Sequence, residues 1–529
     1  MNKILKYTII FASLLSFAGC KKFVDVNNNP NTNTIPKSDL IMSGALAQTY
    51  RLQVSSIINI IPGTWTGNYA HSTSFTGGGA EKTYEYTTAD FDAYTGLFDN
   101  LSDYDYVIKH ADADGVGFWK DAANVMQCYV YQMLVDLYGN VPYSQAFKGL
   151  DNVTPAFDNQ QAIYEDLVVR LDAAIASIKA TTWPTIATIT QQDVYFQGTK
   201  TKWVRFANTL KLRILMRQSF MAGRDTYITD NINSTVADGY LQENVLCQPG
   251  YATISGKLNP FYANFGFNEL GIITSNYQYR KMNRVIVDWL KASNDSLRLI
   301  ALASPVGAQP PTTVSLPLPS TVNGVTYTTA SYTGVPLGAG SGFSTATSSP
   351  IGPMQIQTPL GTRAAMMMLL AESNFLQAEA KERYPSVTLP LTSRQYYEAG
   401  ILAHYRTCAA PSTSGALVNA TTDGYAARYI ARPVAYANWT SSPNKIKAIL
   451  LQKWVSLINI NGLEAWSEYR KASGTPDAGV PVGKTFKTVA STTNPEPARF
   501  LYPQTEYDLN TNVPSGIDRF TSKIFWDVN

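Results

Sequence analysis

The sequence is poor in the residues that usually hold metal ions or cross-link small folds. It has four Cys and three His in 529 residues. The cysteines after residue 20 are odd in number, widely spaced and without a C-x-x-C pair, which argues against a disulfide framework or a zinc site. We predict no metal site, and we interpret these cysteines as buried apolar residues, with one bridged pair as the alternative. They are Cys128, Cys247 and Cys408, and the widely separated histidines are His71, His110 and His404.

Charged residues are also scarce. They make up 15% of the chain, and the formal net charge is only +3. Nucleic-acid binding relies on a concentrated basic stripe that neutralises phosphates. The sequence has no such stripe, so we expect no nucleic-acid partner.

Motifs for catalysis are missing. The chain has no H-E-x-x-H, no G-x-S-x-G and no G-x-G-x-x-G after a strand. The segment 250–258 approaches a phosphate-binding loop, but it has one residue too many and Leu258 where Ser or Thr would hold magnesium. A glycosidase needs two carboxyl groups placed on either side of a sugar in space, and spacing along the sequence does not show this. We interpret acidic pairs such as Asp103 and Asp105 as solvated positions on helix faces. We therefore predict no catalytic residue, no cofactor and no enzyme activity.

Long hydrophobic runs are absent from the chain after its N-terminal segment. No later stretch approaches the roughly 18 apolar residues of a membrane span. Residues 1–19 have the pattern of a signal peptide, a basic start followed by the apolar run Tyr7–Phe17. The run ends with Ala-Gly directly before Cys20, which is similar to a bacterial lipobox with one extra residue. We predict that Cys20 is the lipidated mature N-terminus, with an ordinary signal peptide as the alternative. The mature protein would then be anchored to a membrane without spanning it.

The rest of the chain divides by composition. Residues 20–36 are polar and rich in Asn and Thr, which predicts an extended, lipidated tether. Residues 37–529 are expected to form one large domain. Within it, Pro, Thr, Ser and Gly dominate about 303–359, so we expect an irregular insertion there, with short strands near 325–332.

Aromatic residues are plentiful, at 12% of the chain with 32 Tyr. Many of them lie in Trp65–Phe98, which three consecutive glycines at 77–79 keep from regular structure. Rings fixed on a loop can stack against the apolar face of a sugar. The alternative, which we weigh equally for Trp65, is that the rings anchor the loop to the body. The candidate ligand-binding residues are Trp65, Tyr69 and Tyr84, with Tyr277 and Tyr279 as a second wall.

Apolar residues at helical spacing recur through the chain and predict a mainly helical protein with long loops. The segment Val194–Arg217 is an example, in which Trp203, Phe206 and Leu210 form an apolar stripe. We predict that these three are core residues and that Lys211, Arg213 and Arg217 are solvated on the other face. A helix is also expected to end at Gly139, because Pro142 cannot continue it.

Six segments, in order, resemble motifs of one family. They are DLYGNVPYSQAF at 136–147, KWVRFANTLKLRILMR at 202–217, MMMLLAESNFLQAEAKERY at 366–384, KIKAILLQKWVSLININGLEAWSEYR at 445–470, RFLYPQTEY at 499–507 and KIFWD at 523–527. The chain resembles the SusD/RagB family of nutrient-binding lipoproteins of the outer membrane. The resemblance implies a scaffold of four tetratricopeptide-like helix pairs with a loop-rich remainder packed against it.

The resemblance also implies a function. A lipoprotein at the outer membrane, facing the cell surface, would bind a glycan or another nutrient oligomer and pass it to a SusC-like TonB-dependent transporter. Two alternatives stay open. One is a structural or assembly lipoprotein that uses its helical repeats for protein contacts alone, and the other is a lipoprotein glycosidase.

Overall fold

The structure is a computed structural model, and it describes most of the chain. The described residues are 36–184, 189, 191–307, 318, 320–322, 325–356, 360–409, 415–479, 488–491 and 493–529. The predicted signal peptide, Cys20 and all of the tether except Pro36 lie outside them. Within the described residues, no helix combines the length and the apolar character that a membrane crossing requires.

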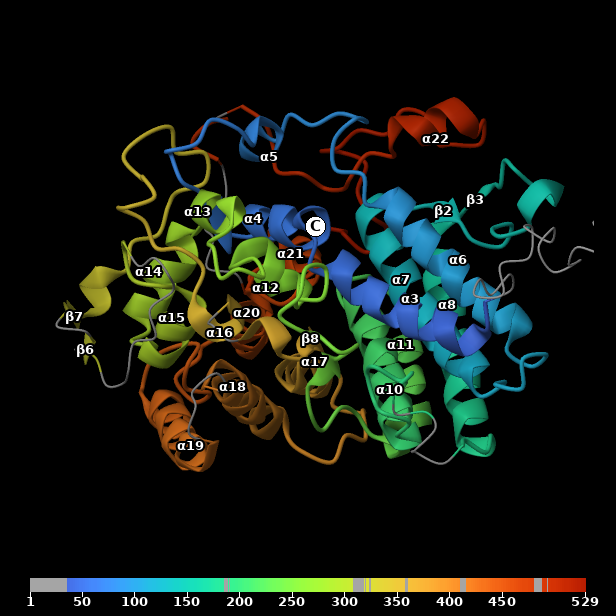
Figure 1. Cartoon of the computed structure of the whole chain (residues 1–529). Helices are drawn as coiled ribbons and strands as arrows, with labels where there is room; N and C mark the ends of the chain where they lie inside the picture. The colour runs from blue at the N-terminus through green and yellow to red at the C-terminus, as the bar shows by residue number, and fades with distance from the viewer. Residues whose placement is uncertain are drawn as a thin grey trace, which may run out of the picture.

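The first part of the chain is a layer of neighbouring helices, seen at the right of Figure 1. Successive members pack on one another: α3 on α6, α6 on α7, α7 on α8, and α8 on α10. Their bounds are α3 Ser38–Gln53, α6 Tyr94–His110, α7 Trp119–Tyr138, α8 Gln160–Ala180, α10 Lys200–Arg217 and α11 Asp225–Thr235. This arrangement confirms the expected scaffold of paired helices.

A second group of helices continues the scaffold after residue 369. In it α17 packs on α18 and α20, α18 packs on α19, and α10 joins the two groups through α17. The bounds are α17 Leu370–Arg383, α18 Ser393–Ala409, α19 Gly415–Ala431, α20 Lys445–Leu457 and α21 Gly462–Ala472.

Short elements and loops cover one end of this scaffold (Figure 1). The helices are α4 Ile61–Trp65, α5 Gly79–Thr83, α12 Pro260–Phe265, α13 Ser275–Tyr279, α14 Arg284–Ala292, α15 Ser296–Leu302, α16 Pro353–Ile356 and α22 Gln504–Leu509. The strands form antiparallel pairs: β1 Tyr69–His71 with β5 Arg280–Met282, β2 Val141–Pro142 with β3 Phe157–Asp158, β4 Val245–Cys247 with β8 Ala365–Met368, and β6 Ser320–Val322 with β7 Val325–Tyr327. The β6–β7 hairpin falls in the described part of the expected insertion, and β7 lies where a short strand was expected.

The helix stop predicted at Gly139 is present. α7 ends at Tyr138, and Gly139 follows with φ of 76°, a conformation that disfavours a side chain. Its N–H donates to the carbonyl of Val135 at 2.9 Å, and Pro142 lies in β2. The chain therefore leaves the helix layer at the predicted residue.

The core predictions are confirmed for the apolar stripe and for the cysteines. Trp203, Phe206 and Leu210 are fully buried. The indole Nε1 of Trp203 donates to the carboxylate of Asp193 at 2.9 Å, so its polar atom is satisfied. The three described cysteines are buried and free, so the alternative of a bridged pair is wrong.

The prediction for the opposite face of α10 is wrong. Lys211, Arg213 and Arg217 are buried, with at most 2% of each residue exposed. Arg217 pairs with Glu468 at 2.7 Å and with Glu464, both on α21. Helical spacing alone assigned these cations to solvent, because their partners lie on other helices. Lys211 pairs with Asp172 on α8, and Arg213 and Arg217 pair with Glu464 on α21.

These ion pairs belong to a buried network where α7, α10, α17, α20 and α21 meet. Lys453 lies 3.1 Å from both Glu464 and Glu468, and Lys471 lies 3.0 Å from Glu379. Burial alone would raise the pKa of Glu464, but the neighbouring cations Arg217 and Lys453 lower it to about 2. The members are Asp136, Arg213, Arg217, Glu372, Glu379, Lys453, Glu464, Glu468 and Lys471. Most of the family-like motifs thus contribute to one buried network rather than to an exposed site.

Candidate functional site

Trp65, the first choice from the sequence, is part of the core. It ends α4, is 2% exposed, and donates from Nε1 to the carbonyl of Glu81 at 3.1 Å. Its ring packs against Trp466, with 5.1 Å between ring centroids, and stacks on Tyr86 at 5.5 Å. In this structure no face of the ring is open to a ligand, so its burial does not support the predicted role as a stacking surface for a sugar. The geometry agrees with the alternative that Trp65 anchors the loop.

Tyr69, Tyr84 and Tyr277 are also fully buried. The hydroxyl of Tyr69 donates to the side chain of Asn459 and accepts from its backbone N–H, each at 3.0 Å. The ring of Tyr84 meets Trp65 edge-on at 6.1 Å. These three rings hold segments together, and in this conformation they present no surface to a ligand.

Tyr279 differs from the other four candidates because it is only partly buried and borders a hollow of about 390 Å³. Phe75, also partly buried, meets it edge-on at 5.6 Å with an interplanar angle of 77°. The lining residues are Phe75, Thr76, Gly77, Gly78, Ser275, Asn276, Tyr279 and Arg280. The structure thus brings the glycine-bearing loop and the predicted second wall together, but around Phe75 and Tyr279 rather than Trp65.

Strand pairing places the two walls of this hollow side by side. β1 and β5 are antiparallel with His71 opposite Arg280, so the loop after β1 lies beside α13, which leads into β5. The N–H of Ser72 donates to the carbonyl of Tyr279 at 2.8 Å. Gly78, with φ of 64°, packs on the Tyr279 hydroxyl so closely that a Cβ atom would collide with it. The glycines allow this close contact between the loop and the ring.

A buried ion pair lies beneath the hollow. Arg280 pairs with Glu81, and its guanidinium also lies 2.7 Å from Nε2 of His71. Burial would raise the pKa of Glu81, but Arg280 and His71 lower it to about 2. Burial lowers the pKa of His71. Arg280 is thus balanced by Glu81, and the residues that line the hollow are rings and uncharged polar groups apart from this paired arginine. The ammonium of Lys82 lies 5.8 Å from the centroid of the Tyr279 ring.

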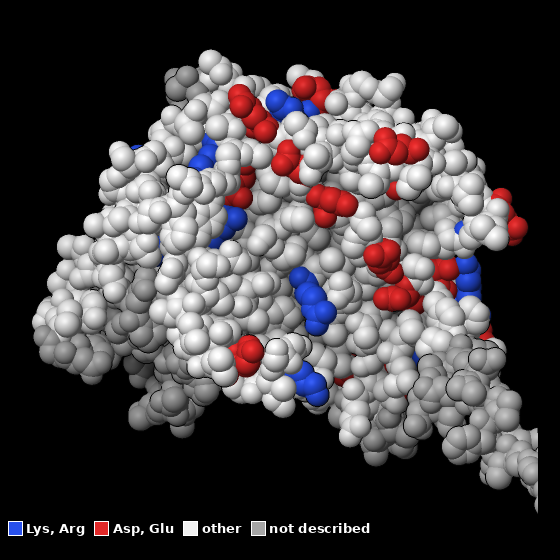
Figure 2. Space-filling view, turned by 45° about the horizontal axis from the view of Figure 1, so that its top comes forward, with Lys and Arg blue, Asp and Glu red and all other residues white. Residues whose placement is uncertain are grey.

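The surface supports the same conclusion about charge. Figure 2 shows broad uncharged areas on this face, with scattered charged side chains that are more often acidic than basic and with no basic stripe. Among the described residues, no group of three His, Cys, Asp or Glu is placed to hold a metal ion. The lining residues Phe75, Asn276 and Arg280 were not selected from the sequence. The only sequence signal for Asn276 and Arg280 was that they lie close to Tyr279 in the chain. Phe75 was one of several aromatic residues on the same loop.

The protein is mainly helical. It has a scaffold of paired helices and a hollow that is formed by loops and lined by aromatic rings. The chain matches the family model of SusD-like proteins, described as "Starch-binding associating with outer membrane", over residues 30–503. The chain belongs to this SusD-like family. A search of the curated proteins returned no match.

Solved structures show the same fold at low sequence identity. A SusD/RagB family protein from Bacteroides thetaiotaomicron aligns with a TM-score of 0.71 and 18% identity, covering 94% of this chain and 100% of that one. A SusD homologue from Bacteroides fragilis gives 0.71 and 20%, covering 93% and 100%. A chitin-binding SusD homologue from Flavobacterium johnsoniae gives 0.69 and 20%, covering 92% and 99%. At these identities the likeness concerns the fold.

Proposed function

We propose that this protein binds a glycan or another nutrient oligomer in the hollow between the loop 72–79 and α13. The observation that carries the proposal is the pair of partly exposed rings, Phe75 and Tyr279, that border this hollow in a member of the SusD-like family. A ring held in place loses little entropy when a sugar stacks on it. Ser275 and Asn276 stand beside the rings and supply uncharged hydrogen-bonding groups. This combination suits a neutral sugar.

Lipidation of Cys20 and delivery to a SusC-like TonB-dependent transporter complete the proposal. Both are supported by the family membership and by the apolar run before Cys20. Two or more acyl chains would give stable anchoring where one chain is marginal. On this proposal the protein works at the outer membrane, facing the cell surface. A Cys20→Ala variant should leave the membrane fraction, and its retention there at the wild-type level would contradict the anchor.

The ligand class is open to direct test. Two of the structural neighbours are described as chitin-binding, so oligomers of N-acetylglucosamine are the first probes to use. Starch oligosaccharides, other polysaccharides and peptides follow in the same calorimetric screen. The purified protein should bind at least one soluble oligomer in the absence of any transporter.

Variants of the two rings test the site. By analogy with ring stacking on nucleobases, Tyr279→Ala and Phe75→Ala should each weaken glycan binding by about 1–3 kcal/mol. Tyr106, a partly buried ring that stacks on His110 in α6, is a matched control, and Tyr106→Ala should leave binding unchanged. Wild-type affinity in both hollow variants would show that the glycan binds elsewhere.

The same experiments separate the alternatives. An assembly lipoprotein would bind no soluble oligomer but would copurify with its neighbouring transporter in mild detergent. A glycosidase would release shorter products from the bound oligomer. Binding without product formation is the result expected from the proposal.

A further inference from the structure

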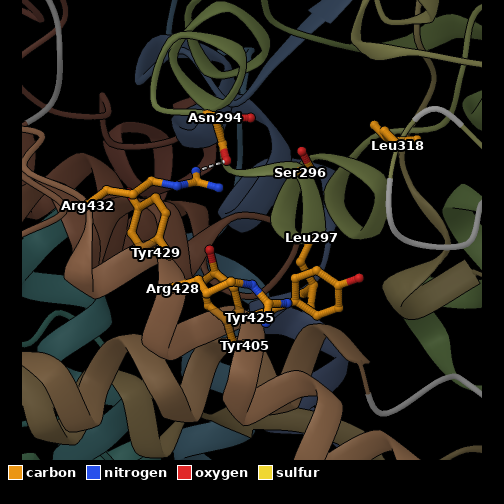
Figure 3. Close-up of a pocket in the computed structure, with 9 residues that line it drawn as sticks. All are labelled: Asn294, Ser296, Leu297, Leu318, Tyr405, Tyr425, Arg428, Tyr429 and Arg432. Carbon is orange, nitrogen blue, oxygen red and sulfur yellow. Dashed lines mark hydrogen bonds between the residues drawn. The ribbon is translucent and has the colours of Figure 1, made fainter.

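A second pocket shares no lining residue with the loop hollow. It has a volume of about 370 Å³, within the range of roughly 300–1,000 Å³ that is typical of small-molecule sites. It is formed where the turn between α14 and α15 faces α18 and α19 (Figure 3). The lining residues are Asn294, Ser296, Leu297, Leu318, Tyr405, Tyr425, Arg428, Tyr429 and Arg432.

The described residues that line this pocket carry positive charge only. Arg428 and Arg432 both line it, and none of the lining residues in the described part of the chain is a carboxylate. Arg432 donates to the backbone carbonyl of Asn294, and this bond joins α19 to the turn (Figure 3). Arg428 is exposed, lies over the ring of Tyr425 at 4.4 Å, and has no ion-pair partner among the residues that the structure describes. A guanidinium in this position is free to pair with an anion.

The nearest buried acid does not cancel this charge. Asp295 is 1% exposed and pairs with Arg298 at 2.5 Å. Its other oxygen accepts from the hydroxyl of Tyr405 at 2.7 Å. The negative charge of Asp295 is therefore balanced behind the pocket wall, and within the described residues neither lining arginine has a carboxylate partner.

The aromatic wall is held in place before any ligand arrives. The guanidinium of Arg298 lies 5.1 Å from the ring centroid of Tyr405 and 5.0 Å from that of Tyr429. Both rings are buried, whereas Tyr425 is only partly buried. Tyr425 therefore offers ring surface beside a free cation. Because this wall is already rigid, its side chains lose little entropy when a ligand binds.

We propose that this pocket binds an acidic sugar unit of an oligosaccharide, with its carboxylate at Arg428 and its ring against Tyr425. Guanidinium groups form strong, directional hydrogen bonds with carboxylates, and the apolar face of a sugar ring packs on an aromatic surface. Ser296 and Asn294 lie at the same opening and can hydrogen-bond the sugar hydroxyls. The loop hollow differs, because its arginine is already paired with Glu81. The inference therefore adds a second site with a different charge preference.

The test uses three probes on the full mature chain: a tetramer of galacturonic acid, its uncharged methyl ester, and tetraglutamate. Isothermal titration calorimetry should show the acidic tetramer binding at least tenfold more tightly than either of the other two. Its affinity should fall as salt is raised, since salt screens an exposed charge. Equal binding of the methyl ester would overturn the role of the carboxylate. Equal binding of tetraglutamate would overturn the role of the sugar ring.

Variants place the binding. Arg428→Gln should weaken binding of the acidic tetramer at least tenfold, and Tyr425→Ala should also weaken it. Arg51→Gln removes the same charge from an exposed position on α3 and should have no effect. Unchanged binding in Arg428→Gln would refute the site.

Tyr279→Ala separates this inference from the proposed function. That variant should lose neutral glycan and keep the acidic tetramer. Loss of the acidic tetramer in Tyr279→Ala would show that the acidic sugar uses the loop hollow instead, and would overturn the second site.

Discussion

Replacement of Trp65 by Ala separates an anchoring ring from a ligand-binding ring. Trp65 is 2% exposed and packs on Trp466 and Tyr86. Truncation of a buried Trp costs about 3–5 kcal/mol, from lost transfer free energy and the cavity left behind. The carbonyl of Glu81 also loses its donor, the indole N–H at 3.1 Å. We therefore expect a loss of about 4–5 kcal/mol in the free energy of unfolding, near the upper end of that range.

The corresponding shift in melting temperature is modest because the chain is large. With about 2.1 cal/mol/K of unfolding entropy per residue, a chain of 529 residues has roughly 1 kcal/mol/K in total. A loss of about 4 kcal/mol then lowers Tm by only about 4 °C. Differential scanning calorimetry resolves this shift, and urea unfolding checks the free energy.

Two controls complete the experiment. Trp289→Ala removes a ring of the same size from a partly buried position on α14 and should cost clearly less than Trp65→Ala. Tyr279→Ala should leave Tm close to that of the wild type while glycan binding falls. A Trp65→Ala protein with wild-type Tm and weakened glycan binding would refute the reasoning, because Trp65 would then act as a ligand contact.

Three further predictions concern the scaffold. Trp203→Ala should cost about 3–5 kcal/mol of unfolding free energy, because the ring is fully buried and its Nε1 is bonded to Asp193; a fully stable variant that loses ligand binding would reverse this assignment. Lys453→Met should cost up to about 3–5 kcal/mol in urea unfolding. It removes one buried cation shared by Glu464 and Glu468, which keep Arg217 but lose part of the positive charge that balances them. A stability equal to that of wild type would show that the network tolerates the loss. Tm should fall as the pH drops from about 5 towards 2. The pKa of Glu464 is about 2 in the folded protein against an ordinary value of 4.5. Its stabilising effect is therefore fully present above pH 4.5 and is lost as the pH falls towards the folded pKa. Glu464→Gln should flatten that fall, and an identical pH slope in the variant would contradict the assignment.

The sequence was sufficient to predict the features that depend on neighbouring residues. Gly139 and Pro142 end a helix through backbone conformation, which is a local property. The stripe of Trp203, Phe206 and Leu210 is a property of a single helix, and its burial was predicted from spacing. The family-like segments also identified the scaffold, because each motif is a pattern of neighbouring residues that can be recognised in the sequence alone.

Only the tertiary structure decided which polar and aromatic side chains are exposed. Arg217 is buried because Glu468, 251 residues later in the chain, lies against it. Trp65 is buried because α21 and residues near Phe500 close over it. Tyr279 borders the hollow because β5 pairs with β1, which places the glycine-bearing loop beside it. Helical or loop spacing cannot encode such contacts, because the exposure of a side chain depends on which distant segments pack against it.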